Sequence, residues 1–155
     1  MTESTIAHDT FVVERTYDAP IAQVFRAWAD PVRKARWFAG STDALGAGYE
    51  LDFRVGGREV NRGGPPSGPV YTYESVFHDI VPEERIIYTY EMHADETRIS
   101  VSVATVQFRR HESSTQLILT EQGAFLDGHD TAAQREEGSR ALLDSLGAIL
   151  DGGGS

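Results

Sequence analysis

Apolar and polar residues alternate in about six stretches of the chain, a pattern that is typical of β-strands with one buried face. In the first stretch, Phe11, Val13, Arg15 and Tyr17 share one face. The later stretches are joined by short connections, such as the polar turn with a proline at 81–85, which predicts an antiparallel sheet. The predicted strands are residues 10–17, 48–55, 70–80, 85–93, 98–110 and 114–122.

Two segments between the first and second predicted strands show the helical repeat instead. Asp18 can cap the first helix, and Pro20 suits its first turn. Asp30-Pro31 ends this helix and begins a second one over residues 31–38, which delivers Trp37 and Phe38. The apolar stripe of the first helix consists of Ile21, Val24, Phe25 and Trp28.

The C-terminal part of the chain predicts one long amphipathic helix. Thr131 and Gln134 have the spacing of a capping box, and Asp130 adds negative charge near the helix start. Since one face of an antiparallel sheet must be buried, this helix is the element that can cover it. Its apolar stripe consists of Leu142, Leu143, Leu146, Ile149 and Leu150.

Composition narrows the class of protein. The 155 residues suit one domain, which we place at 8–151 with flexible termini at 1–7 and 152–155. The net charge of −10 disfavours nucleic-acid binding, because backbone phosphates would be repelled. The absence of cysteine excludes disulfides and thiolate chemistry. We see no signal peptide and no apolar run long enough for membrane insertion, so we expect a cytoplasmic protein.

Residues 54–69, RVGGREVNRGGPPSGP, form a glycine-rich segment that raises the question of phosphate binding. A phosphate-binding loop needs a lysine after its last glycine and a helix behind it. Here Gly64 is followed by Pro65, and the next predicted element is a strand. We therefore interpret the segment as a connecting loop that can act as a lid over a cavity mouth.

Five segments together resemble the START-like SRPBCC superfamily, and within it the bacterial branch related to the C-terminal domain of heat-shock-protein ATPase activators, which is polyketide cyclase-like. The resemblance runs from about Phe11 to Leu150. The segments are YDAPIAQVFRAWADPVRKARWF (17–38), GYELDFRVGG (48–57), ESVFHDIVPEERIIYTYEM (74–92), STQLILTEQG (114–123) and REEGSRALLDSLGAIL (135–150).

The resemblance implies an α+β helix-grip fold of the START and birch-pollen-allergen type. Such a fold is a curved antiparallel β-sheet of about six strands around the long C-terminal helix, with two short helices between strands 1 and 2 and a cavity between sheet and helix. Many relatives carry glycine-tryptophan in the last helix, where this chain has Gly138-Ser139. Gly138 either leaves room for a ligand or allows a close helix–sheet approach, and we favour the close approach.

The predicted cavity gathers aromatic residues from neighbouring strands. Tyr71 and Tyr73 share one strand face, and Tyr88 and Tyr90 share another, so several phenol groups meet in an apolar space. A packed core with satisfied hydroxyl groups is the alternative. The residues that we expect to line the cavity are Trp37, Phe53, Tyr71, Tyr73, Tyr88, Tyr90, Phe108, Leu119, Glu121, Gly138 and Leu142.

Glu121 has the same parity as Leu117 and Leu119 on the last predicted strand, so it points inward if the leucines do. A buried carboxyl group would serve as a polar anchor or general base, with Arg15 as a possible counter-charge. The alternative is that the strand has ended and Glu121 is solvated.

No metal site, cofactor or nucleophilic serine is predicted. The five histidines, His8, His78, His93, His111 and His129, have no metal-ligand spacing, and the chain has no G-x-S-x-G motif. We assign no catalytic residue. Three hypotheses stay open: a monomeric or homodimeric binder of a lipid-, aromatic- or polyketide-like molecule, a cyclase or hydrolase on the same scaffold, and a co-chaperone-like interaction domain.

Overall fold

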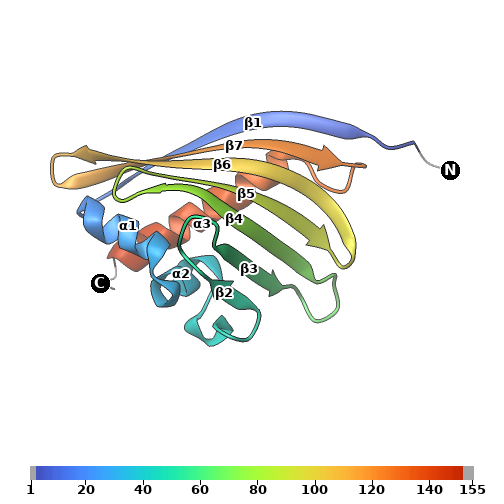
Figure 1. Cartoon of the computed structure of the whole chain (residues 1–155), viewed down its shortest axis with the longest axis horizontal. Helices are drawn as coiled ribbons and strands as arrows, with labels where there is room; N and C mark the ends of the chain where they lie inside the picture. Colours follow the sequence, from blue (N-terminus) through green and yellow to red (C-terminus); the bar gives the residue numbers. More distant parts are fainter. Residues whose placement is uncertain (1–2, 152–155) are drawn as a thin grey trace.

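The computed structural model describes residues 3–151, which form one antiparallel sheet with helices on one of its faces. The strands curve around the long helix α3, while β1 and β2 lie at opposite edges (Figure 1). The sheet has seven strands in the order β1-β7-β6-β5-β4-β3-β2. The strands are β1 (Ile6–Tyr17), β2 (Tyr49–Leu51), β3 (Arg58–Gly63), β4 (Tyr71–Val81), β5 (Arg85–Ala94), β6 (Thr97–His111) and β7 (Ser114–Leu126).

The helices are α1 (Ile21–Ala29), α2 (Pro31–Phe38), the short 3₁₀ helix η1 (Thr42–Ala44) and α3 (Ala132–Asp151). The Asp30 carboxylate accepts a hydrogen bond from the Arg33 N–H at 3.1 Å and so caps α2. Thr131 caps α3 in the same way through the Gln134 N–H, also at 3.1 Å. The prediction for Asp18 is wrong, because Pro20 is the N-cap of α1 and no side chain caps it.

The core lies between the sheet and α3, as the alternation of residues predicts. Every second residue of the central strands is buried, for example Tyr73, Ser75 and Phe77 on β4. The stripe of α3 meets this face, and Leu143 and Leu146 are buried there. The helix-grip architecture expected from the sequence is confirmed, with one strand more than expected.

The extra strand lies inside the segment that we interpreted as one loop. β2 ends at Leu51 instead of continuing to residue 55, and Arg58–Gly63 form β3, which pairs with β2 and β4. A tight turn separates β2 from β3, and a Cβ at Gly57 would lie 2.1 Å from the Asp52 carbonyl oxygen. Val55, which the predicted strand 48–55 included, lies in this turn and is 57% exposed.

The start of β1 and the C-terminal GGGS segment lie at the two ends of the chain. β1 begins at Ile6, where it pairs with Leu126 of β7, and is therefore longer than the predicted strand. The GGGS segment at 152–155, predicted to be flexible, lies outside the described residues. None of the helices in residues 3–151 combines the length and the apolar character that crossing a bilayer requires.

Candidate functional site

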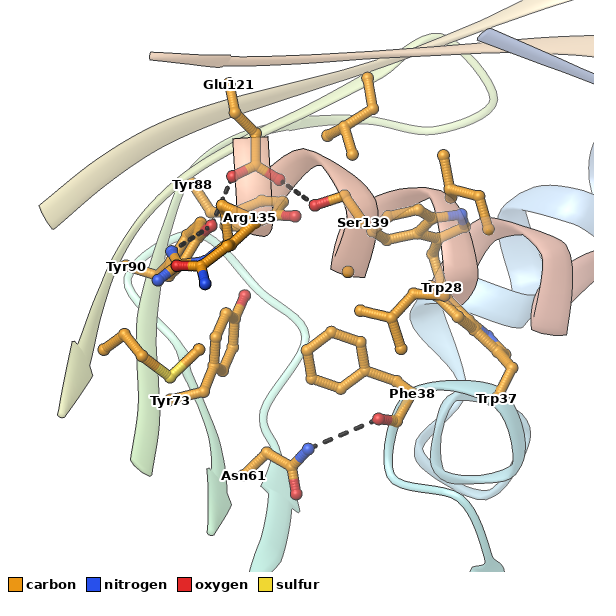
Figure 2. A pocket seen from close by; sticks show the side chains of 16 residues that line it. Trp28, Trp37, Phe38, Asn61, Tyr73, Tyr88, Tyr90, Glu121, Arg135 and Ser139 are labelled. Atoms are coloured by element: carbon orange, nitrogen blue, oxygen red, sulfur yellow. Dashed lines mark hydrogen bonds between the residues drawn. The ribbon is translucent and has the colours of Figure 1, made fainter. Parts of the chain in front are cut away.

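A cavity of about 390 Å³ lies between α3, the α1–α2 pair and the inner face of the sheet. This volume falls within the range of small-molecule sites, roughly 300–1,000 Å³. Gln134 and Gly138 line the cavity and are also exposed, so it opens to solvent along this side of α3. Figure 2 shows the aromatic and polar side chains that surround it.

Aromatic rings build most of the cavity wall. Trp28 and Trp37 pack edge to face at 4.9 Å between ring centroids, and Phe38 meets Tyr73 at 5.1 Å. The Tyr73 ring lies 4.8 Å from that of Tyr90. α1 and α2 thus supply one aromatic wall and β4 and β5 the facing one, because the helical repeat and the strand alternation both turn these rings inward.

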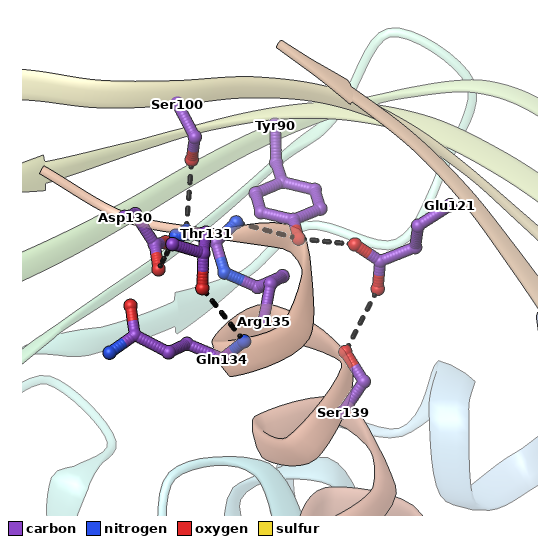
Figure 3. A network of polar contacts seen from close by, with 8 residues as sticks. All are labelled: Tyr90, Ser100, Glu121, Asp130, Thr131, Gln134, Arg135 and Ser139. Carbon is purple, nitrogen blue, oxygen red and sulfur yellow. Dashed lines mark hydrogen bonds and ion pairs between the residues drawn. The ribbon is translucent and has the colours of Figure 1, made fainter. Parts of the chain in front are cut away.

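One end of the cavity is polar. The hydroxyl of Tyr90 donates a short hydrogen bond to the Glu121 carboxylate, and the Ser139 hydroxyl donates to its other oxygen at 3.1 Å (Figure 3). Arg135 donates to the Tyr90 oxygen at 3.0 Å. These contacts connect β5, β7 and the first turns of α3 through side chains alone.

Arg135 also reaches toward the surface. Its guanidinium donates to the Ser100 hydroxyl at 2.9 Å and forms an ion pair with Asp130. The side chains of this pair are only 11% and 13% exposed. Arg135 lies within cation–π distance of Tyr90, with its guanidinium carbon 5.5 Å from the ring centroid.

Burial governs the ionisation of these groups. Glu121 is 4% exposed, and desolvation raises the pKa of its carboxyl group, although the Tyr90 hydrogen bond and the Arg135 charge oppose the rise. Burial and the neighbouring Glu121 raise the pKa of Tyr90, so its hydroxyl stays protonated and donates. The prediction that Glu121 points inward is correct, because β7 continues to Leu126.

The counter-charge suggested for Glu121 is wrong. Arg15 pairs with Asp144 on α3 at 2.8 Å, and its side chain is 26% exposed. Arg135 is the cation near Glu121, and the Tyr90 hydroxyl bridges the two. Sequence reasoning had no signal for Arg135, because its contacts to β5 and β6 join residues far apart in the chain.

The structure places eight of the predicted residues on the cavity wall: Trp37, Tyr73, Tyr88, Tyr90, Leu119, Glu121, Gly138 and Leu142. Three predicted residues lie elsewhere. Phe53 packs between Phe25 and Phe77, and Phe108 packs against Phe25 and Trp28 in the core. Tyr71 is the first residue of β4, is 44% exposed and does not line the cavity.

Other wall residues were missed. Trp28 and Leu143 belong to predicted helical stripes, and Ser139 belongs to the Gly138-Ser139 pair, so signals for these three were present. Phe38, Asn61, Met92, Gln134 and Arg135 complete the wall. Within 54–69, the segment interpreted as a lid, only Asn61 lines the cavity.

The interpretation of Gly138 as a close-contact glycine is wrong. A Cβ built at Gly138 would have no heavy atom within 4 Å. The close approach occurs nearer the C-terminal end of α3, at Gly147, where a Cβ would lie 3.3 Å from the Tyr17 ring. Gly138 therefore leaves space at the cavity wall, the alternative that the sequence kept open.

A second buried polar group lies behind the aromatic wall. The Lys34 ammonium donates to Glu59 at 3.0 Å, and the Tyr49 hydroxyl donates to the other Glu59 oxygen at 2.6 Å. Both Lys34 and Glu59 are 1% exposed. Burial lowers the pKa of Lys34, whose ammonium lies 4.5 Å from the Phe38 ring centroid. This group joins α2 to the β2–β3 hairpin.

Among residues 3–151, no cluster of three or more His, Cys, Asp or Glu side chains could hold a metal ion. His78 contacts Thr89 at 2.9 Å on the exposed side of the sheet. The site therefore offers hydrogen-bond donors, one buried carboxyl group and aromatic surface as its means of recognition.

A known protein family matches most of this chain. The family described as activator of Hsp90 ATPase homolog 1-like protein matches residues 18–151. That range includes every residue of the cavity wall. No curated protein matches this chain.

Solved structures agree in fold. A putative uncharacterized protein from Rhizobium leguminosarum is 43% identical, with a TM-score of 0.91 over 97% of this chain and 99% of that chain. A protein from Rhizobium loti is also 43% identical, with a TM-score of 0.86 over 93% and 98% of the two chains. A putative protein of the dynemicin biosynthetic locus has a TM-score of 0.67 at 18% identity, over 94% of this chain and 48% of that one, and shares the fold alone.

Proposed function

Because the chain belongs to the family of activator of Hsp90 ATPase homolog 1-like proteins, within the SRPBCC superfamily, we propose that it binds a small hydrophobic molecule in its cavity. The observation that carries this proposal is the cavity of about 390 Å³, with aromatic walls and one polar end. Sites for small molecules have this character, with a few polar groups that fix orientation in a mostly apolar space.

Burial of apolar ligand surface supplies the driving force, at about 25 cal/mol for each Å² removed from water. The rings of Trp28, Phe38 and Tyr73 provide flat surfaces against which an aromatic or lipid-like molecule packs. The polar end orients the ligand, since Tyr90, Glu121 and Arg135 are already held in place by their mutual hydrogen bonds.

A direct experiment looks for the natural occupant. The purified protein is denatured, and the released small molecules are identified by mass spectrometry against a mock purification. A library of aromatic and lipid-like compounds is then screened by thermal shift, because a ligand at 100 times its Kd stabilises the native state by about 2.7 kcal/mol. We expect at least one compound class to raise the Tm.

The screen needs a control in which the cavity is filled. Gly138→Leu places a side chain where a Cβ has no neighbour within 4 Å, so the fold tolerates it while the cavity shrinks. A compound that raises the Tm of this variant as much as that of the wild type binds elsewhere. If every hit behaves in this way, the proposal is wrong.

One observation favours a second candidate, acid–base catalysis on the same scaffold. Glu121 is a buried carboxyl group with a raised pKa at the cavity wall, which is the environment of many general acids and bases. Turnover of a bound compound that Glu121→Gln abolishes, with binding retained, would support this candidate over simple binding.

A further inference from the structure

The hydroxyl group of Tyr73 has no hydrogen-bond partner among residues 3–151, although Tyr73 is only 7% exposed. Buried polar groups in folded proteins are almost always paired. In Figure 2 this hydroxyl points into the cavity, on the side of Arg135. Tyr73 is thus a wall residue whose hydroxyl group has no described hydrogen-bond partner.

Arg135 lines the same part of the cavity and retains donor capacity. Its described hydrogen bonds go to Tyr90, Ser100 and Asp130. A guanidinium group carries five N–H donors, so these three contacts leave two donors for another acceptor. Arginine cannot accept a hydrogen bond, and a ligand group that meets both Arg135 and Tyr73 must therefore be an acceptor.

Charge at this end of the cavity disfavours an anionic acceptor. The single cation, Arg135, already forms an ion pair with Asp130, and the Glu121 carboxyl group lies next to Tyr90. A further carboxylate would enter without a free counter-charge, and burial of an uncompensated charge is costly. A carbonyl oxygen accepts hydrogen bonds without bringing charge.

On the premise of the proposed function, we propose that the ligand is a neutral aromatic ketone or related carbonyl compound, whose oxygen accepts hydrogen bonds from Tyr73 and Arg135. The rest of the ligand packs between the aromatic wall of α1 and α2 and the facing strands. This assignment accounts for the unpaired hydroxyl, the free donors of Arg135 and the apolar character of the remaining wall.

Three probes with the same ring system distinguish a neutral, an apolar and an anionic ligand: 2-acetylnaphthalene, 2-ethylnaphthalene and 2-naphthoate. They carry a neutral acceptor, no polar group and an anionic acceptor on the same ring system. Dissociation constants are measured by calorimetry or fluorescence at pH 7.5. We expect the naphthoate to bind at least about tenfold more weakly than the ketone, because its charge is not compensated.

The decisive variant is Tyr73→Phe, which removes an unpaired hydroxyl and so leaves the fold without a lost contact. This variant should raise the dissociation constant of the ketone roughly fivefold to tenfold, because one hydrogen bond is lost. The dissociation constant of the hydrocarbon should change by no more than about twofold. Tyr71→Phe is the matched control, because Tyr71 is 44% exposed and lies outside the cavity. It should change neither constant.

Each other result overturns the assignment. If Tyr73→Phe weakens ketone and hydrocarbon equally, or affects neither, Tyr73 does not bind a carbonyl group. If the naphthoate binds more tightly than the ketone, the ligand class is anionic. If the hydrocarbon binds but the ketone does not, the inference fails while the proposed function stands. If none of the three probes binds, the aromatic-ketone assignment fails, and the thermal-shift screen decides the proposed function separately.

Discussion

The carboxylate of Glu121 accepts a hydrogen bond from the hydroxyl of Ser139 at 3.1 Å, which joins β7 to α3 at the cavity wall. Ser139 follows Gly138 on this helix, so a small hydroxyl side chain beside a glycine pairs with a buried carboxyl group. The helix therefore contributes a polar contact and open space to the cavity wall.

The raised pKa of Glu121 makes stability depend on pH. Its native pKa lies above the ordinary value of 4.5, so the native state binds the proton more tightly than the unfolded state. The stabilising contribution of protonated Glu121 is complete below about 4.5 and is lost as the pH rises through the native pKa. Glu121→Gln lacks this loss, because its side chain is neutral at every pH.

Urea denaturation at intervals from pH 4 to pH 8 checks this expectation. The unfolding free energy of the wild type, relative to Glu121→Gln, should fall as the pH rises. A difference that stays constant would mean that Arg135 and the hydrogen bonds of Tyr90 and Ser139 cancel desolvation, and one that grows in favour of the wild type would mean that they outweigh it.

Lys34 and Glu59 form a buried ion pair that should respond sharply to loss of one partner. Lys34→Met leaves a carboxylate that is 1% exposed with only Tyr49 as a described donor, so we expect a loss of about 3–5 kcal/mol in unfolding free energy. The triple variant Lys34→Met, Glu59→Leu, Tyr49→Phe removes all the polar groups and should lose less. Denaturant unfolding measures both.

An exposed ion pair provides the control for that series. Arg110 and Glu83 are 3.0 Å apart with side chains 70% and 40% exposed. Arg110→Met should cost no more than about 1 kcal/mol, because solvent screens surface pairs. If Lys34→Met costs as little as Arg110→Met, the buried pair contributes little to the position of α2.

Gly138 should be replaceable by alanine with a gain in stability. Nothing lies within 4 Å of the added methyl group, and removal of a helical glycine raises the unfolding free energy by roughly 0.5–1 kcal/mol. Gly147→Ala in the same helix is the comparison. Its methyl group would lie 3.3 Å from Tyr17, so it should gain less or lose stability. Equal gains at both positions would contradict the close contact described between Gly147 and Tyr17.

Much of the fold could be predicted from local sequence patterns. β4 to β7 alternate regularly because one face of the sheet is buried, and the C-terminal half of α3 has an apolar stripe. β3 was not predicted, because its residues, REVNRG, have little apolar character. It forms because β2 and β4 supply hydrogen-bonding partners on both sides, which is a tertiary effect.

The site was predictable only where a residue belonged to such a pattern. Tyr73, Tyr90 and Glu121 follow strand parity, and the structure places them on the cavity wall. Arg135 lies 45 residues from Tyr90 and 35 from Ser100, so no local pattern links them. The unpaired hydroxyl of Tyr73 is likewise a property of the packed structure, because parity gives direction but not hydrogen-bond partners.

The central claim, that the cavity binds a small hydrophobic molecule, is tested most directly by titration of 2-ethylnaphthalene into the wild type, Gly138→Leu and Glu137→Leu. The two variants place the same side chain on adjacent positions of α3, but only Gly138 lines the cavity. We predict that Gly138→Leu weakens binding at least about tenfold by occupying apolar volume, while Glu137→Leu binds like the wild type. Equal affinity of Gly138→Leu and the wild type would contradict the claim.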